Sequence, residues 1–417
     1  MRYATLLRYK AKLHYFLWRC RTYHIRRRYA ITFCCDPDLT FWISPDRIQL
    51  AFVPSVLGHL DIEISPLEIT PAIERGKVVD GDWDLQVIPF EDSSVWKAFR
   101  HRFIVHGSWS ETSFYDRVVS TIRRGTVLWN CRTKEEFDLR LRQIEMLFKD
   151  IEQNGYKPQT SINDSFKALG KEDEIHVHIG RNGDYIFADG RHRLCIAKIL
   201  NLPKIPVKVA RRHTQWSSFR AEILAYARKG DGVYALILHP DLSDIPAVHG
   251  HERMEIIKIH LPEKPGRMLD IGAHWGYFCH RFEDLGYQCM AVENSLLNVR
   301  FMEKLRRAEN RHFEIFAGSI FAADFSTTFD VVLSLNIFHH FLKEETLYKN
   351  LVKFLRSLDA KVMFFEPHDP DEPQMKTSFA NYGPDEFVEF VRVHGQFASA
   401  ERIGVSPDGR PLFKLVR

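Results

Sequence analysis

Residues 266–294 read "GRMLDIGAHWGYFCHRFEDLGYQCMAVEN" and follow the pattern of a strand, a tight turn, a helix and a second strand. The turn carries Gly272 and Gly276, and the second strand ends at Glu293. An acid about 20 residues beyond such a turn holds ribose hydroxyls in nucleotide-binding βαβ units. The turn lacks the three-glycine spacing that brings a pyrophosphate against a helix N-terminus. The stretch therefore predicts a Rossmann-like unit for a ligand without a pyrophosphate.

Further segments around this stretch carry a resemblance to a known family. They are "VYALILHPDLSDIPAVHGHERMEII" (233–257), "FAGSIFAADF" (316–325), "FDVVLSLNIFHHFL" (329–342) and "KVMFFEPHDPDE" (361–372). In this order they resemble the helical lead-in, the adenine-contacting loop, the loop beside the transferred methyl group and the next strand of class I S-adenosylmethionine-dependent methyltransferases. The resemblance covers roughly residues 230–417 and implies S-adenosylmethionine as cofactor.

The resemblance also implies roles for single residues. Asp270 and Gly272 would shape the loop at the methionine end, and Glu293 would take both ribose hydroxyls. The sequence departs from the family pattern at His274, in place of a glycine, and at Ser319, in place of an acid. Adenine recognition would then rest on backbone groups and an aliphatic side chain. The full set of expected cofactor residues is Asp270, Gly272, His274, Gly276, Glu293, Ser319, Ile320 and Asn336.

Two adjacent histidines, His339 and His340, follow the strand that would border the methyl group. A hydroxyl acceptor benefits from a base with a pKa near 7, and imidazole has that range. A phosphate or carboxylate acceptor needs no base. A His-His pair after a strand can also serve packing alone. The pair is a candidate for catalysis on these grounds.

The middle of the chain carries a second motif, "ADGRHRLCIAKILNLPKIPVKV" (188–209), preceded by an Asn182-Gly183 hairpin signal. With "IEQNGYKPQ" (151–159), this order resembles the ParB/sulfiredoxin-like superfamily, whose members bind nucleotides at the equivalent turn. The "DGRHR" form is most similar to the kinase-like branch, because Arg191 replaces the sulfiredoxin cysteine. Free N–H groups at a helix start also favour anions. The expected phosphate ligands are Asp189, Gly190, Arg191, His192 and Arg193.

An acidic turn lies upstream in "VVDGDWDLQ" (78–86). In a kinase, Asp82 and Asp84 would bind Mg²⁺ or act as base beside ATP or another nucleotide. A solvated turn is the alternative for this segment.

Length and composition limit the remaining possibilities. A chain of 417 residues predicts two or three domains, placed at 1–90, 91–229 and 230–417. The net charge of +4 does not favour nucleic acid, and seven cysteines without a CxxC pair indicate a reducing, cytoplasmic compartment. Residues 1–30 hold nine Lys and Arg but no acid, with apolar and aromatic residues between them. Such a segment either lies on an anionic membrane, at its inner face, or packs on the protein.

The sequence thus predicts a multidomain α/β and α+β chain. Its C-terminal half would be a methyltransferase, and its middle would be a ParB-like domain that binds nucleotide and, in one hypothesis, acts as a kinase. The acceptor would be a glycan, a glycolipid or a phosphorylated small molecule. One alternative is a nucleic-acid-directed methyltransferase, although the loop at Asn336 lacks the Asp/Asn-Pro-Pro-aromatic signature. The other alternative is a nucleotide-responsive scaffold without turnover.

Overall fold

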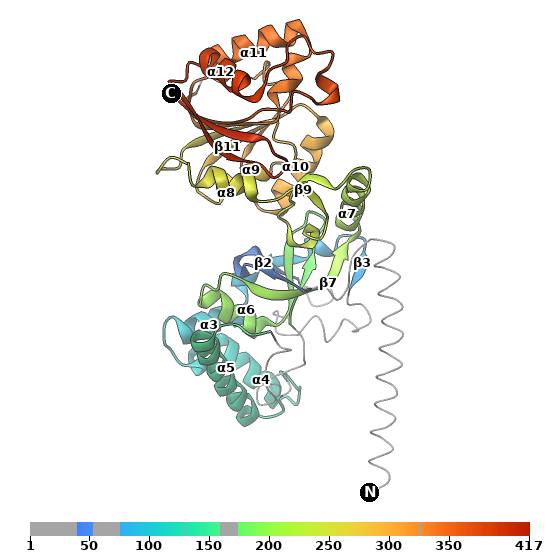
Figure 1. Ribbon diagram of the computed structural model, residues 1–417. Coiled ribbons are helices and arrows are strands. Elements are labelled where there is room, and N and C mark those ends of the chain that lie inside the picture. Colours follow the sequence, from blue (N-terminus) through green and yellow to red (C-terminus); the bar gives the residue numbers. More distant parts are fainter. Residues whose placement is uncertain (1–39, 53–75, 130, 159–173, 324, 326) are drawn as a thin grey trace. The chain divides into compact units, whose positions relative to one another are not determined.

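The computed structural model describes residues 40–52, 76–129, 131–158, 174–323, 325 and 327–417. The chain divides into two compact units, unit 1 (1–223) and unit 2 (224–417), and each is treated by itself (Figure 1). The predicted boundary between residues 229 and 230 lies close to this division. The basic segment 1–30 lies outside the described residues. No described helix is both long and apolar enough to cross a membrane.

Unit 1 contains a mixed sheet of seven strands in the order β1-β7-β5-β6-β2-β4, with β3 also paired to β7. The strands are β1 (Thr40–Ile43), β2 (Ile48–Phe52), β3 (Lys77–Val79), β4 (Val87–Pro89), β5 (Ile175–Ile179), β6 (Tyr185–Asp189) and β7 (Ile205–His213). The helices are α3 (Ser94–Phe103), α4 (Ser113–Arg123), α5 (Lys134–Asn154), α6 (Arg191–Ile199) and the start of α7 (Thr214–Ala227). Short 3-10 helices are η1 (Pro45–Arg47), η4 (Trp83–Leu85), η5 (Phe90–Asp92) and η6 (Trp109–Glu111).

The predicted hairpin in unit 1 is confirmed. Strands β5 and β6 pair antiparallel around the turn at Asn182-Gly183, and helix α6 and strand β7 follow. Both strands of this hairpin are buried along nearly their whole length, because helices and neighbouring strands cover them. The likeness of this unit to ParB and sulfiredoxin stays a prediction.

Unit 2 contains a second seven-stranded sheet in the order β12-β11-β10-β13-β14-β16-β15. Neighbours from β12 to β14 pair parallel, and β16 joins antiparallel. Its strands are β10 (Arg267–Ile271), β11 (Gln288–Glu293), β12 (Glu314–Ala317), β13 (Phe329–Leu335), β14 (Ala360–Glu366), β15 (Ser399–Val405) and β16 (Pro411–Val416). The predicted Rossmann-like sheet is therefore present.

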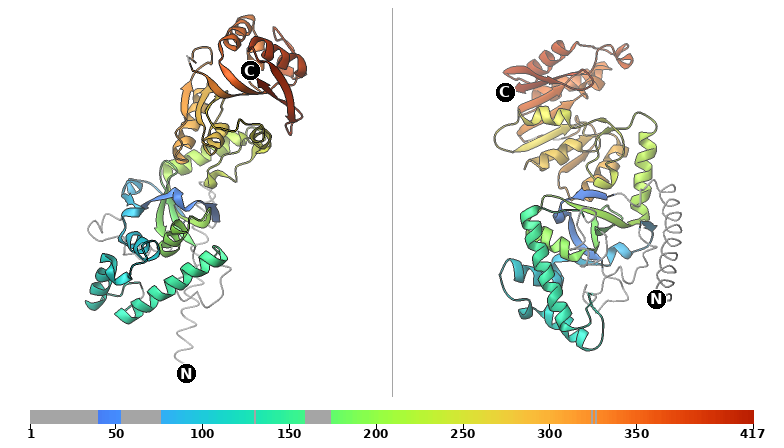
Figure 2. Two further views of the ribbon diagram at one scale, coloured as in Figure 1. Left: turned by 90° about the vertical axis from the view of Figure 1, so that its left-hand side faces the viewer. Right: turned by 60° about the horizontal axis from the view of Figure 1, so that its bottom comes forward.

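Helices cover both faces of this sheet (Figure 2). They are α8 (Glu252–Lys258), α9 (Tyr277–Glu283), α10 (Leu296–Ala308), α11 (Glu345–Ser357) and α12 (Pro384–His394), with the 3-10 helices η9 (Pro240–Leu242), η10 (Phe338–Leu342) and η11 (Pro373–Met375). A short parallel pair, β8 (Val233–Ala235) and β9 (Ala247–His249), stands apart from the sheet.

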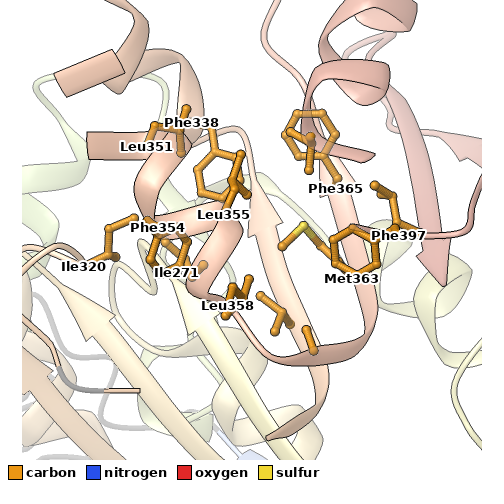
Figure 3. Packing of buried hydrophobic residues seen from close by; sticks show 14 of the residues in the cluster. Ile271, Ile320, Phe338, Leu351, Phe354, Leu355, Leu358, Met363, Phe365 and Phe397 are labelled. Carbon is orange, nitrogen blue, oxygen red and sulfur yellow. The ribbon is translucent and has the colours of Figure 1, made fainter. Parts of the chain in front are cut away.

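Two apolar clusters hold the helices to the sheet. One packs side chains of η10, α11 and α12 on the strands, including Phe338, Phe354 and Phe365 (Figure 3). The other packs α8, α9 and α10 on the opposite face through Met254, Phe282 and others. From β10 the chain adds β11 and β12 on one side of the sheet and then β13 and β14 on the other. Ligands of open α/β sheets bind beyond the carboxyl ends of the strands at such a switch point.

Candidate functional site

A cavity of about 470 Å³ opens at the carboxyl ends of the strands in unit 2. This main cavity has the size of small-molecule sites, which span about 300–1,000 Å³. Six of the expected cofactor residues line it, namely Gly272, His274, Glu293, Ser319, Ile320 and Asn336. The fold thus collects residues from the ends of four strands, β10 to β13, as the order of motifs predicted.

The turn after β10 needs its glycines for steric reasons. Gly272 has a φ of +73°, and an added Cβ would lie 2.7 Å from Cγ1 of Ile337. Gly276 has a φ of +82°, and its Cβ would meet Met302 and Phe313 at 3.1 Å. Gly276 packs the start of α9 on its neighbours and lines neither this cavity nor the side cavity described below. This position gives Gly276 a role in close packing of the helix start.

His274 fills the place of the missing glycine in the left-handed region, with a φ of +52°. Its backbone N–H donates to Oε2 of Glu293 at 2.8 Å, and its ring stacks on Trp275. Burial lowers the pKa of His274 to about 4, so the ring is neutral at pH 7. His274 therefore holds a strained backbone conformation in the loop, and its flat ring forms part of the cavity wall.

Glu293 ends β11 and is 8% exposed. Besides the His274 amide, its carboxylate accepts from the backbone N–H of Ser295 at 2.8 Å and from Nδ2 of Asn298 at 3.4 Å. These donors fix the orientation of the carboxylate at the cavity wall. A fixed carboxylate there can accept two vicinal hydroxyls without reorganising.

Asp270 is 4% exposed at the end of β10. Burial, together with the charge of Glu293, raises the pKa of Asp270 to about 7. Asp270 lines a narrower side cavity of about 40 Å³, which shares Gly272 and His274 with the main cavity. The sequence placed this acid in the loop but gave no sign of its pKa.

Sequence reasoning missed the groups opposite Asp270 in the side cavity. Nη1 of Arg253, on α8, donates to Oε2 of Glu366 at 3.1 Å and to the hydroxyl of Tyr234 at 3.2 Å. Arg253 is 3% exposed, and Glu366 also accepts from the Ser406 hydroxyl. Over a hundred residues separate Arg253 from Glu366, so no local pattern could pair them.

Asn336 lies beyond β13 with a φ of +54°, and its backbone N–H donates to the carbonyl of Glu366 at 2.8 Å. Its side-chain Oδ1 is buried and has no hydrogen-bond partner among the described residues. A buried acceptor that lacks a donor is costly unless a ligand supplies one. This favours a ligand that offers a hydrogen-bond donor to the loop at Asn336.

The two candidate histidines lie in η10 and both line the main cavity. His339 is 3% exposed, whereas His340 is exposed. Burial, with smaller effects of His340 and His368, lowers the pKa of His339 to about 3. Burial and the charge of Lys343 also lower the pKa of His340. The expectation of a pKa near 7 is therefore wrong for His339, because its imidazole is largely removed from water.

In unit 1, the expected phosphate turn lies at the start of α6. Gly190 caps the helix with a φ of +90°, and an added Cβ would lie 2.9 Å from Cα of Ile175. Its backbone N–H donates to Oδ1 of Asp189 at 2.8 Å. Arg191 is buried. The turn thus has the expected backbone geometry.

Two of the expected phosphate ligands are engaged by the protein itself. Arg193 donates to the carbonyl of Lys157 at 2.9 Å, pairs with Glu174 at 3.5 Å and covers the ring of Tyr156. The ring of His192 stacks on Phe99 and meets Trp129 edge-on at 4.4 Å. Tertiary packing therefore uses both side chains, and their expected role as phosphate ligands stays a prediction.

The aspartates of residues 78–86 are also paired within unit 1. Asp84, 7% exposed, accepts from Nη2 of Arg181 at 2.7 Å, from its Nε at 2.9 Å and from its backbone N–H at 2.7 Å. Asp82 is exposed and meets the same guanidinium at 2.7 Å. Among the residues described, no group of three or more His, Cys, Asp or Glu is arranged to hold a metal. Arg181 thus neutralises Asp84 in this structure, and the expected metal or base role of Asp82 and Asp84 stays a prediction.

The structure also keeps these aspartates away from the phosphate turn. Arg181 belongs to the turn of the β5–β6 hairpin, where Ile179 faces Tyr185, whereas Asp189 faces His176 at the other end. The four residue steps of β6 alone span about 13 Å. The two predicted halves of a kinase site therefore lie at opposite ends of one hairpin.

Comparison with protein families gives one match. Residues 269–359 match the methyltransferase domain family. Unit 2 contains a methyltransferase domain. The matched segment runs from β10 to the end of α11 and includes Glu293, Asn336 and the two histidines. No curated protein matches the chain.

Several solved structures are similar to part of the chain. The bifunctional kinase-methyltransferase WbdD is 20% identical with a TM-score of 0.37, over 46% of this chain and 46% of WbdD. The PH0226 protein of Pyrococcus horikoshii OT3 is 19% identical with a TM-score of 0.31, over 40% of this chain and 88% of its own. A putative O-methyltransferase of Nostoc punctiforme PCC 73102 is 16% identical with a TM-score of 0.32, over 40% of this chain and 55% of its own. The chain thus spans under half the length of WbdD.

Proposed function

We propose that unit 2 transfers the methyl group of S-adenosylmethionine to an oxygen atom of a small-molecule or glycan acceptor. The observation that carries this proposal is the main cavity at the strand ends, in which Glu293 and Asn336 face the space left by the Gly272 turn. The domain match over residues 269–359 supports it. The acceptor would be a glycan, a glycolipid or a phosphorylated small molecule.

The residues present fit this cofactor. Glu293 offers a fixed carboxylate for two ribose hydroxyls, and Ser319 and Ile320 line the cavity where the adenine would lie. In the side cavity, Arg253 and Tyr234 suit a carboxylate, while Asp270 suits an ammonium group. Any side chain at position 272 would collide with Ile337 and would prevent the cofactor from approaching this backbone closely. The donor and acceptor set matches an adenosine linked to an amino acid.

Bound S-adenosylmethionine supplies an activated methyl group on a sulfonium, so the protein mainly has to hold the acceptor oxygen in line with it. Asn336 and the η10 loop would border that position. His340, neutral at pH 7 and exposed to the cavity, would take a proton from an acceptor hydroxyl. His339 would position His340, since their ring centroids lie 4.0 Å apart.

For unit 1 we propose nucleotide binding at the start of α6, on the backbone groups after Gly190 and on Arg191. The left-handed cap at Gly190 supports this, because it leaves the helix N-terminus without a side-chain cap. A kinase activity that uses ATP and Mg²⁺ would need Arg181 to release Asp84, or would need another base. We also propose that residues 1–30 bind an anionic membrane at its cytoplasmic face.

Calorimetry with S-adenosylmethionine, followed by transfer of a labelled methyl group to candidate acceptors with and without ATP, tests these functions. Binding that disappears in Glu293→Ala supports the methyltransferase. Equal transfer in both conditions would refute a coupled kinase step. Absence of binding would favour the scaffold alternative, and a labelled product degraded by nuclease would favour the nucleic-acid alternative.

A further inference from the structure

The main cavity extends past Asn336 to a group of polar side chains that no motif predicted. Glu372 and Gln374, from the loop after β14, and Arg410, just before β16, line this acceptor end together with His340. Oε1 of Glu372 accepts from Nη2 of Arg410 at 2.8 Å, and its Oε2 accepts from Nε2 of Gln374 at 2.5 Å. The three planar groups therefore hold one another in place.

The charges at this end are already matched. Arg410 pairs with Glu372 and also with Asp408. Although burial opposes it, the carboxylates of Glu372 and Asp408 raise the pKa of Arg410. Burial also opposes the shift at Glu372, but the hydrogen bonds from Gln374 and Arg410 keep its pKa below its ordinary value. Lys343 donates to Oε1 of Gln374 at 2.8 Å but does not line the cavity. The acceptor end therefore has no excess of positive charge.

The histidines add no positive charge either. Burial lowers the pKa of His339 to about 3 and lowers the pKa of His340, so both rings are neutral at pH 7. A phosphate or carboxylate placed here would meet Glu372 and a guanidinium that two carboxylates already share. Specific anion sites instead use cations with free N–H forks.

We propose that the acceptor end binds an uncharged polyhydroxyl group, such as the ring of a sugar without phosphate or carboxylate, and that Glu372, Gln374 and Arg410 select it. This inference rests on the proposed methyltransferase function and narrows its acceptor. Vicinal hydroxyls can donate to Glu372 and accept from Gln374 or Arg410, and Phe341 supplies an apolar surface for the C–H face of the ring. A network ordered before binding lowers the entropy cost of recognition.

The transfer step balances for a hydroxyl acceptor. The hydroxyl oxygen forms the new O–CH₃ bond with a lone pair, while the electron pair of the broken C–S bond returns to sulfur. His340 takes the hydroxyl proton and later releases it to water. The products are a methyl ether and S-adenosylhomocysteine.

Saturation-transfer NMR on the full chain, saturated with S-adenosylhomocysteine, tests the inference with two probe sets. One set is the methyl glycosides of neutral hexoses, and the other is the same glycosides carrying a 6-phosphate. We expect signals from neutral glycosides and weaker signals from phosphates. In Glu372→Gln, neutral glycosides should bind about tenfold more weakly, as for a lost hydrogen bond to a charged group. In Gln374→Ala the loss should be smaller but measurable, as for a neutral hydrogen bond. Glu345→Gln, an exposed change on α11, is the matched control and should bind as the wild type does.

Stronger signals from the phosphates, or no signal from any neutral glycoside, would overturn the inference. Unchanged neutral signals in both variants would do the same. Calorimetry of the wild type with S-adenosylhomocysteine separates the two levels of the argument. If S-adenosylhomocysteine does not bind, the proposed methyltransferase function is refuted. If it binds tightly but no neutral glycoside is recognised, only the proposal of a neutral acceptor is refuted.

Discussion

Replacing Asp270 with asparagine should stabilise unit 2 by an amount that grows with pH. Asp270 is 4% exposed, and burial and Glu293 raise its pKa from 3.8 to about 7. The folded protein therefore binds a proton here that the unfolded chain has released at the same pH. Its contribution is most favourable below about pH 4 and is lost as pH rises to about 7. Asparagine has nearly the same shape and does not titrate.

The size of the effect follows from the two pKa values. The interval from 3.8 to about 7 corresponds to about 4 kcal/mol, at about 1.4 kcal/mol for each pH unit. This is an upper value, because partial hydration of an ionised Asp270 would reduce it. The difference in the free energy of unfolding between Asp270→Asn and the wild type, the gap, should widen between about pH 4 and pH 7 and then level off.

Hydrogen exchange read by mass spectrometry on peptides from residues 266–294 measures local opening in the intact chain. Asp330→Asn provides a control with the opposite sign. The hydrogen bonds from Lys361 and the Arg267 amide lower the pKa of Asp330, so its contribution is present at neutral pH and is lost as pH falls. Asp330→Asn should thus destabilise at pH 7 and have little effect in acid.

A gap between Asp270→Asn and the wild type that stays constant from pH 4 to pH 8 would refute this reasoning. It would mean that Asp270 keeps its ordinary pKa and that its carboxylate is hydrated in the free protein. A gap that narrows as pH rises would contradict the sign of the argument outright.

Three further changes test other parts of the chain. Gly272→Ala places a Cβ 2.7 Å from Ile337 at a φ of +73°, so calorimetry should show S-adenosylmethionine binding at least about tenfold weaker, and wild-type affinity would contradict the steric argument. Glu293→Gln should weaken the same ligand but not 5′-deoxyadenosine analogues that lack both ribose hydroxyls; equal losses would exclude the ribose role. Arg181→Ala should destabilise unit 1 clearly more than Asp82→Asn in urea titration, because it leaves the buried Asp84 without its main cation, whereas Asp82 is the exposed partner. Similar costs for both changes would refute the assigned pairing.

Local patterns in the sequence predicted much of the fold. The strand–turn–helix–strand pattern of residues 266–294 and the Asn182-Gly183 hairpin are both present in the structure. Each rests on the spacing of apolar residues or on a backbone conformation that favours glycine, and both act over a few residues. The order of the motifs also placed Glu293 and Asn336 at the same cavity, since parallel strands end at one edge of the sheet.

Partners distant in the chain were decided only by tertiary structure. Arg181 neutralises Asp84 across about a hundred residues, Arg253 meets Glu366, and Arg410 meets Glu372. Which charges meet depends on how strands order and helices pack, and no local spacing encodes that. The pKa values of Asp270 and His339 depend in the same way on burial, which is a property of the completed fold. The sequence alone therefore determined that unit 2 would have a cavity at its strand ends, whereas the tertiary structure decided which charges line it.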